Sequence, residues 1–206
     1  MARTQGVAAA VALALSGCAT AASIIYPVNR EALEARPGDY TLDPQHASVL
    51  FAVEHLGFST FYGRFADISG RLALNGAEPP NSDVAIRIGA ASIDTLSVDL
   101  NDQLKGDGMF DAAAHPDILF SSTRVSITGE NEADVEGVLT IKGVSAPLTI
   151  HAVFHGGGTA PVTGARTVGF DASAALSRKQ FGLDRWSGFV GDEVRLIISA
   201  EFVQEK

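Results

Sequence analysis

The 206-residue chain contains one cysteine and one tryptophan, and few of its charges are positive. Cys18 is alone, which excludes an intramolecular disulfide and a metal site built from cysteines. Lys and Arg number 15 against 24 Asp and Glu, for a net charge of −9. Such an acidic chain repels phosphates, so we expect no nucleic-acid partner. The apolar run Val7–Leu15 is far shorter than the roughly 20 residues of a membrane-spanning helix.

The N-terminal residues follow the order of a secretory signal. Arg3 provides the positive region, Val7–Leu15 the apolar region, and small residues follow. The segment Leu15-Ser16-Gly17-Cys18 resembles the bacterial lipobox, in which the cysteine is acylated and becomes the mature N-terminus. The alternative is an ordinary signal cleaved near Ala19 or Ala22.

A lipidated Cys18 predicts a stable membrane anchor, because two or three acyl chains hold a protein permanently. The residue after Cys18 is Ala19 and not Asp, a pattern that resembles outer-membrane sorting. We therefore expect an exported protein on the periplasmic side of the envelope, anchored to the outer membrane. The expected segments are a signal peptide over 1–17, a lipidated tether over 18–38 and one domain over 39–206.

From Tyr40 onward the sequence alternates with a period of two, which is typical of strands with one buried face. We expect strands within 48–55, 63–74, 83–90, 117–128, 135–141, 148–154, 166–176 and 194–202. Turns are indicated at Asn75-Gly76, Thr128-Gly129, Lys142-Gly143 and Gly156-Gly157-Gly158. One segment departs from this period: Asp99 could cap a short helix that ends at Gly106 or Gly108. About eight antiparallel strands with one helical insertion predict an all-β barrel or sandwich.

The inward strand positions carry large apolar side chains. They either pack a closed core, which the residues alone favour, or line a long apolar tube. His55 shares its face with Phe51 and Val53, so it either contacts the polar head of a ligand or is a core histidine bonded to the backbone. The candidate lining residues are Phe51, Val53, His55, Phe65, Phe120, Leu139, Phe154, Phe170 and Phe202.

The remaining polar residues give weaker signals. His151 and His155 share one strand face and are expected to be exposed. Arg64, Lys105, Arg178, Lys179 and Arg185 could contact a pyrophosphate, but the preferred interpretation is solvated surface. We find no grouping of carboxylate, histidine and nucleophile, and we expect neither a catalytic residue nor a metal site.

Eight blocks of sequence follow one another over about four-fifths of the chain: 43–57, 63–65, Gly70, 91–95, 99–111, 115–123, 137–144 and 177–183. In this order they resemble the YceI-like family. The resemblance implies an eight-stranded antiparallel, lipocalin-like barrel with an elongated apolar pore. It also implies non-enzymatic binding, storage or transport of a polyisoprenoid or isoprenoid quinone, with no other cofactor. Dimers are reported in the family, which makes a homodimer one candidate assembly. The alternatives are an envelope stress or interaction module and a quinone-linked redox partner that uses His55.

Overall fold

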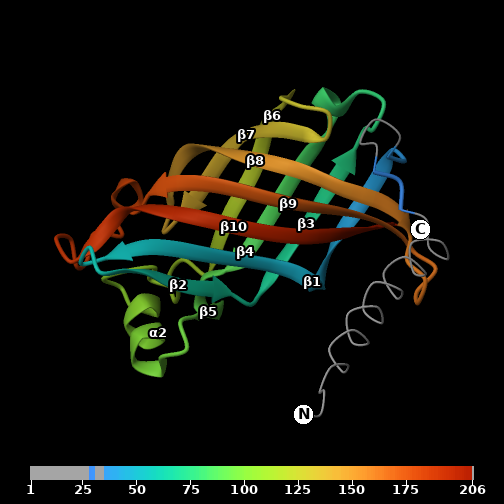
Figure 1. Cartoon of the computed structure of the whole chain (residues 1–206). Coiled ribbons are helices and arrows are strands. Elements are labelled where there is room, and N and C mark those ends of the chain that lie inside the picture. Colours follow the sequence, from blue (N-terminus) through green and yellow to red (C-terminus); the bar gives the residue numbers. More distant parts are fainter. Residues whose placement is uncertain (1–27, 31–34, 206) are drawn as a thin grey trace, which may run out of the picture.

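The computed structural model describes residues 28–30 and 35–205 (Figure 1). The expected signal peptide, Cys18 and most of the expected tether lie outside the described residues. The first strand, β1, begins at Gly38, one residue before the expected domain boundary. The described part of the chain contains no helix with the length and hydropathy of a membrane span.

The domain is one antiparallel sheet closed into a barrel. The strand order is β10-β9-β8-β7-β6-β4-β3-β1-β2-β5, and an additional pairing of β10 with β1 closes the sheet on itself. The eight strands from β10 to β1 form the barrel, which confirms the predicted fold class, while β2 and β5 extend from it. The strands are β1 (Gly38–His55), β2 (Ser59–Phe65), β3 (Ile68–Leu74), β4 (Asp83–Gly89), β5 (Ile93–Asp94), β6 (Asp117–Ile127), β7 (Glu132–Ile141), β8 (Val144–Thr159), β9 (Arg166–Ser177) and β10 (Val190–Gln204).

Strand β1 changes its partner halfway along its length. Residues Gly38–Thr41 pair with β3, whereas Val49–His55 pair with β2. The register against β10 shifts between Leu42 and Ala47, so residues 43–46 form a bulge. Within the bulge, the Asp43 carboxylate accepts a hydrogen bond from the Gln45 N–H at 2.9 Å and lies 2.8 Å from the His46 ring. The block 43–57 that resembles the YceI-like family therefore begins at the bulge of β1. His46 is exposed in this bulge.

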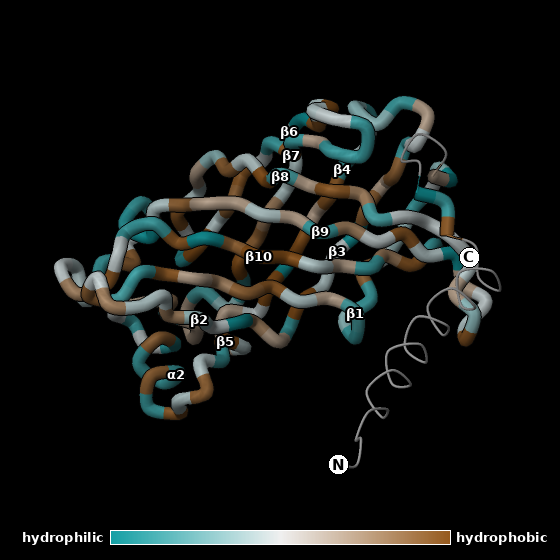
Figure 2. Tube along the Cα trace, in the orientation of Figure 1, coloured by the Kyte–Doolittle hydropathy of each residue, from teal (hydrophilic) through white to brown (hydrophobic). Residues whose placement is uncertain are grey.

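The alternation of the long strands places one apolar row inside the barrel. On β10, Val194 and Leu196 face inward, whereas Glu193 and Arg195 are exposed. Figure 2 shows the same alternation of apolar and polar residues along the neighbouring strands. Burying the apolar row contributes roughly 25 cal/mol per Å² of surface removed from water, which makes this pattern decisive for the register.

The helical insertion is α2 (Val98–Lys105), which lies below the β2 end of the barrel in Figure 1. Its N-cap is Ser97, not the predicted Asp99, because the Ser97 hydroxyl accepts a hydrogen bond from the Leu100 N–H. Asp99 lies instead in the first turn, where a negative charge is favourable. Gly106 is the C-cap, as one of the two predicted ends. Short 3₁₀ turns complete the secondary structure at 79–81, 90–92 and 178–181.

Two sequence predictions of strand boundaries are wrong. The expected strand over 63–74 is interrupted at Ala66 and Asp67, because β2 and β3 pair with different halves of β1. The three glycines 156–158 form no turn but lie inside β8. A Cβ on Gly156 would lie 2.3 Å from Val28 Cγ1, so glycine allows the segment at Asn29 to pair with Gly157. The turn follows at residues 160–165, where the Ala160 N–H donates to the Ala165 carbonyl.

Candidate functional site

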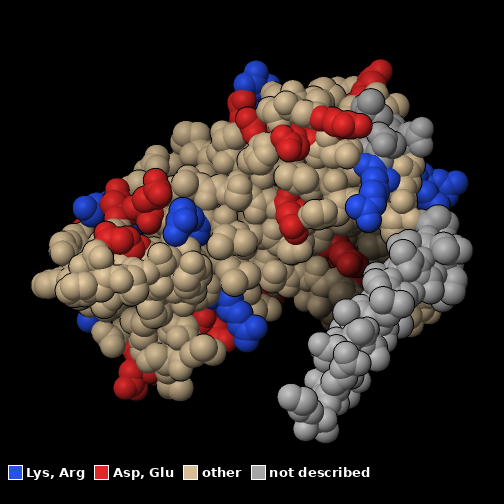
Figure 3. Space-filling view, in the orientation of Figure 1, with Lys and Arg blue, Asp and Glu red and all other residues tan. Residues whose placement is uncertain are grey.

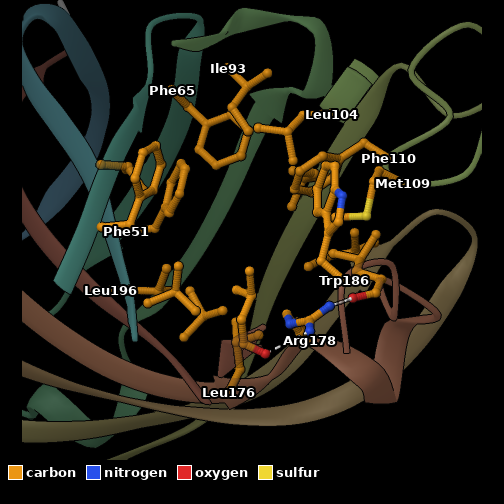
Figure 4. Close-up of a pocket in the computed structure, with 18 of the residues that line it drawn as sticks. Phe51, Phe65, Ile93, Leu104, Met109, Phe110, Leu176, Arg178, Trp186 and Leu196 are labelled. Carbon is orange, nitrogen blue, oxygen red and sulfur yellow. Dashed lines mark hydrogen bonds between the residues drawn. The ribbon is translucent and has the colours of Figure 1, made fainter. Parts of the chain in front are cut away.

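An apolar cavity of about 420 Å³ occupies one end of the barrel, here called the mouth cavity. Its volume lies within the range of small-molecule sites. The lining comes from β1, β2, β9 and β10 on one side and from α2 and the loop after it on the other (Figure 4). Single residues or pairs from β4, β5, β6 and β7 and residues of the β9–β10 loop complete it. Among the described residues that line it, His55, Arg178 and Trp186 are the ones with polar side-chain atoms. A space of this composition favours apolar ligands, because filling it removes hydrocarbon surface from water.

Aromatic rings form one wall of the mouth cavity. The rings of Phe51 and Phe65 are 5.9 Å apart, and Phe65 meets Phe110 edge to face at 5.8 Å (Figure 4). The ring of Phe51 lies over Gly63, where a Cβ would come within 2.3 Å of Phe51 Cζ. Gly63 therefore leaves the space that the tip of the Phe51 ring occupies. The first pair is tilted and the second is edge to face, an arrangement that aromatic rings favour.

Arg178 closes the same cavity from the opposite side and is only 4% exposed. Its Nε donates to the Gly191 carbonyl at 2.8 Å, and Nη2 donates to the Val190 carbonyl at 3.0 Å. Its Nη1 donates to the carbonyls of Leu183 and Arg185. The prediction of a solvated Arg178 is therefore wrong, because four backbone carbonyls replace water around the guanidinium. This side chain fixes the loop between β9 and β10 over the cavity.

The other predicted cations lie at the surface or in ion pairs. Arg64 pairs with Asp94 at 3.0 Å, and Lys105 lies 3.9 Å from Asp102. The backbone N–H of Leu96 and the Arg64 guanidinium hold the pKa of the Asp94 carboxyl below its ordinary value. Arg185 covers the ring of Trp186, with its guanidinium carbon 4.7 Å from the ring centroid. Lys179 is exposed.

Exposed apolar side chains surround the opening of the mouth cavity. Phe58 is 87% exposed in the turn after β1, and Phe189 is 62% exposed in the loop before β10. The Leu56 N–H donates to the Phe189 carbonyl at 2.9 Å, so this turn and this loop lie side by side. We call Leu56, Phe58 and Phe189 the apolar rim. Figure 3 shows mainly uncharged residues at this tip of the molecule, on the left.

The backbone is also strained at this end of the barrel. Leu56 and Trp186 have φ angles of 56° and 61°, in the left-handed region that side chains disfavour. Leu96, next to α2, has a φ of 62°. Such strain is commonly concentrated at ligand sites, because the surrounding structure must hold it in place.

A second apolar cavity of about 270 Å³ lies at the other end of the barrel, here called the distal cavity. Its lining includes Phe154 and Phe170, whose rings are 5.4 Å apart. Strand residues Leu72, Val84 and Val135 contribute further apolar surface. The pore implied by the family resemblance is thus divided in this chain into two cavities.

The predicted lining residues are distributed between the mouth cavity, the distal cavity and the core. The mouth cavity is lined by Phe51, Val53, His55, Phe65 and Leu139, and the distal cavity by Phe154 and Phe170. Phe120 and Phe202 are buried in the core and line neither cavity. Contact of any of them with a ligand stays a prediction.

Sequence reasoning missed the lining residues from the helical side of the mouth cavity. Leu104, Met109 and Phe110 come from α2 and the irregular segment after it, and Trp186 comes from the β9–β10 loop. The spacing of Leu100 and Leu104 indicated one apolar face of the helix. For Met109, Phe110 and Trp186 no periodicity exists that would have identified them, since they lie outside regular elements.

Two histidines of β8, the half-buried His151 and the exposed His155, pair with carboxylates. His151 lies 2.9 Å from Asp134, and His155 lies 2.8 Å from Asp171. Hydrogen bonds from His155 and Ser199 lower the pKa of Asp171 below its ordinary value. Among the residues described, no group of three His, Cys, Asp or Glu side chains is arranged to hold a metal ion.

Comparison with known proteins identifies the domain. Residues 40–202 match the family model described as "YceI-like domain". A UPF0312 protein of Azotobacter vinelandii is 36% identical over 174 residues, covering 84% of this chain and 90% of that protein. A UPF0312 protein of Pseudomonas aeruginosa is 35% identical over the same length, with the same coverage.

Solved structures share the fold at low sequence identity. Burkholderia cenocepacia BcnA superposes with a TM-score of 0.71 at 24% identity, covering 78% of this chain and 98% of BcnA. A polyisoprenoid binding domain from Saccharophagus degradans gives a TM-score of 0.63 at 13% identity, covering 82% of this chain and all of that domain. At these identities the likeness establishes the fold alone.

Proposed function

Because the chain belongs to the family of YceI-like domains, we propose that it binds an isoprenoid lipid, of the polyprenyl or quinone type, without catalysing a reaction. The observation that carries this proposal is the mouth cavity, with about 420 Å³ of almost wholly apolar lining. The similarity in fold to a polyisoprenoid binding domain supports the same ligand class. Recognition of such a ligand rests on buried hydrocarbon surface, which this lining provides.

The cavity also orients its ligand. Its inner part is the part lined from within strands, by Phe51, Leu139 and Leu196, whereas His55 is the last residue of β1 and Trp186 lies in the β9–β10 loop. A lipid tail gains most by entering the inner part, and a polar head then lies near His55 and the loop that Arg178 fixes. The imidazole of His55 can donate or accept one hydrogen bond, which suits a hydroxyl or a quinone carbonyl.

The ligand class also fits the expected location. We propose that Cys18 is acylated and anchors the barrel to the periplasmic side of the outer membrane, in support of storage or transport of lipid within the envelope. The apolar rim at the cavity opening supports exchange with a lipid surface, because its exposed rings would be removed from water on contact.

Native mass spectrometry with solvent extraction tests the binding proposal directly. The barrel from Gly38 onward is purified without detergent and then incubated with polyprenyl phosphates and with isoprenoid quinones. We expect a bound isoprenoid of defined mass, either retained from the cells or acquired in the incubation. A protein that carries none and takes up neither class would contradict the proposal and favour an interaction module.

A further inference from the structure

One row of side chains separates the mouth cavity from the distal cavity. On β6, Ile118 lines the first and Val125 the second, and Phe120 lies between them in sequence. Phe120 is 6% exposed and belongs to the buried core. Its position along the barrel is therefore the level at which the two cavities are divided.

The neighbouring strands show the same arrangement. On β4, Ile88 lines the mouth cavity and Val84 the distal one, with Ile86 between them. On β7, Leu139 and Val135 line the two cavities, with Gly137 between them. The division is thus a continuous layer across three adjacent strands.

In this layer each large side chain leans over a glycine of a neighbouring strand. Phe120 and Ile86 are direct partners across β6 and β4. A Cβ on Gly137 would lie 2.5 Å from Phe120 Cζ, and a Cβ on Gly70 would lie 2.5 Å from Ile86 Cδ1. The two glycines therefore create the space that the ring and the isoleucine fill, and Leu148, opposite Gly137 on β8, is buried beside them.

We infer that Phe120, packed on Gly137, is the partition that sets the length of lipid tail the protein accepts. This inference rests on the proposed function, in which the tail enters the mouth cavity. A tail that reaches the level of Phe120 meets the ring, although about 270 Å³ of apolar space continues beyond it. The Phe120 ring thus limits the tail that the mouth cavity accepts, and its removal opens the layer toward the distal cavity.

The test compares tail-length preference in the wild type and in Phe120→Ala. Geraniol, farnesol, geranylgeraniol and longer all-trans prenols are titrated against a bound fluorescent apolar probe. In the wild type, affinity rises with length and then stops rising. In Phe120→Ala the rise continues to longer prenols, because each additional buried methylene improves affinity by about fourfold.

Two further variants make the result specific. Phe154→Ala enlarges the distal cavity without opening the partition, so its length preference matches the wild type. Phe120→Leu keeps a branched side chain and gives an intermediate preference; it replaces Phe120→Ala should that variant not fold, which circular dichroism reports.

The possible outcomes separate the two proposals. A wild type that binds neither a prenol of any length nor a polyprenyl phosphate or isoprenoid quinone overturns the proposed function. A wild type that binds prenols, while folded Phe120 variants stop at the same length, overturns the partition. An equal shift of length preference in Phe154→Ala also overturns the partition, because removing any aromatic ring from the core would then have the same effect.

Discussion

The Nη2 atom of Arg178 donates a hydrogen bond to the carbonyl oxygen of Val190 at 3.0 Å, and Val190 is also the β10 partner of His55 on β1. The buried guanidinium is thereby linked to the strand pair that closes the barrel. It holds the loop that carries Trp186 and Phe189, so the shape of the cavity opening depends on a side chain that lies beneath it.

Replacing Arg178 with methionine should destabilise the fold by about 3 kcal/mol or more, because buried carbonyls lose their donors. Urea denaturation monitored by circular dichroism measures the loss. Arg178→Lys should recover only part of the stability, since an ammonium group cannot reproduce the planar set of donors. Equal stability of Arg178→Met and the wild type would show that these carbonyls find other partners.

Trp186 should report ligand binding, because it is the single tryptophan of the chain and lines the mouth cavity. Entry of an apolar tail replaces water near the indole, so we expect its emission to move to shorter wavelength during a titration with farnesol. Trp186→Phe should lose this signal and still bind prenol in native mass spectrometry. Unchanged emission at a ligand concentration that saturates the protein by mass would place the ligand elsewhere.

The apolar rim should accelerate loading from membranes. We expect the double substitution Phe58→Ser and Phe189→Ser to slow the transfer of a fluorescent prenol from neutral lipid vesicles by about tenfold, because two exposed rings no longer contribute to contact with the lipid. Final occupancy should fall less than the rate, because Phe189 is the rim residue that also lines the mouth cavity.

Val162→Ser is the matched control, since Val162 is 94% exposed in the turn between β8 and β9 at the opposite end of the barrel. Transfer rates that fall equally in the control and in the rim variant would argue against entry through this opening.

Asp192 should make the free energy of unfolding dependent on pH. Hydrogen bonds from the Ser177 hydroxyl, at 2.7 Å, and from the Lys179 N–H hold its pKa below the ordinary value. A depressed pKa means that the ionised form stabilises the fold above the unfolded-state pKa of about 4, and that this contribution is lost as pH falls through the folded-state pKa. The free energy of unfolding of Asp192→Asn should therefore be lower than that of the wild type at neutral pH. In acid the two values should converge. A difference that is the same at both pH values would rule out this titration.

The residues of the long strands predicted the barrel and most of its inward face. In Val194 to Phe202 and in Val168 to Leu176 every second residue is apolar, and a period of two leaves only one face for the core. The same reasoning placed Gly156–Gly158 in a turn, because a glycine run carries no information about what packs against it. Only the approach of Val28 and Asn29 shows why these residues stay in a strand.

The sequence by itself determined the all-β class, the inward row of apolar side chains and the family. The tertiary structure decided which of those side chains surround free space. Phe51 and Phe120 have the same chemistry and the same inward direction, yet Phe51 lines a cavity and Phe120 divides two. The difference lies in the glycine over which each ring leans, Gly63 or Gly137, and in the level of that glycine along the barrel. The burial of Arg178 was equally inaccessible, because its four acceptors are backbone carbonyls that only the folded loop brings together.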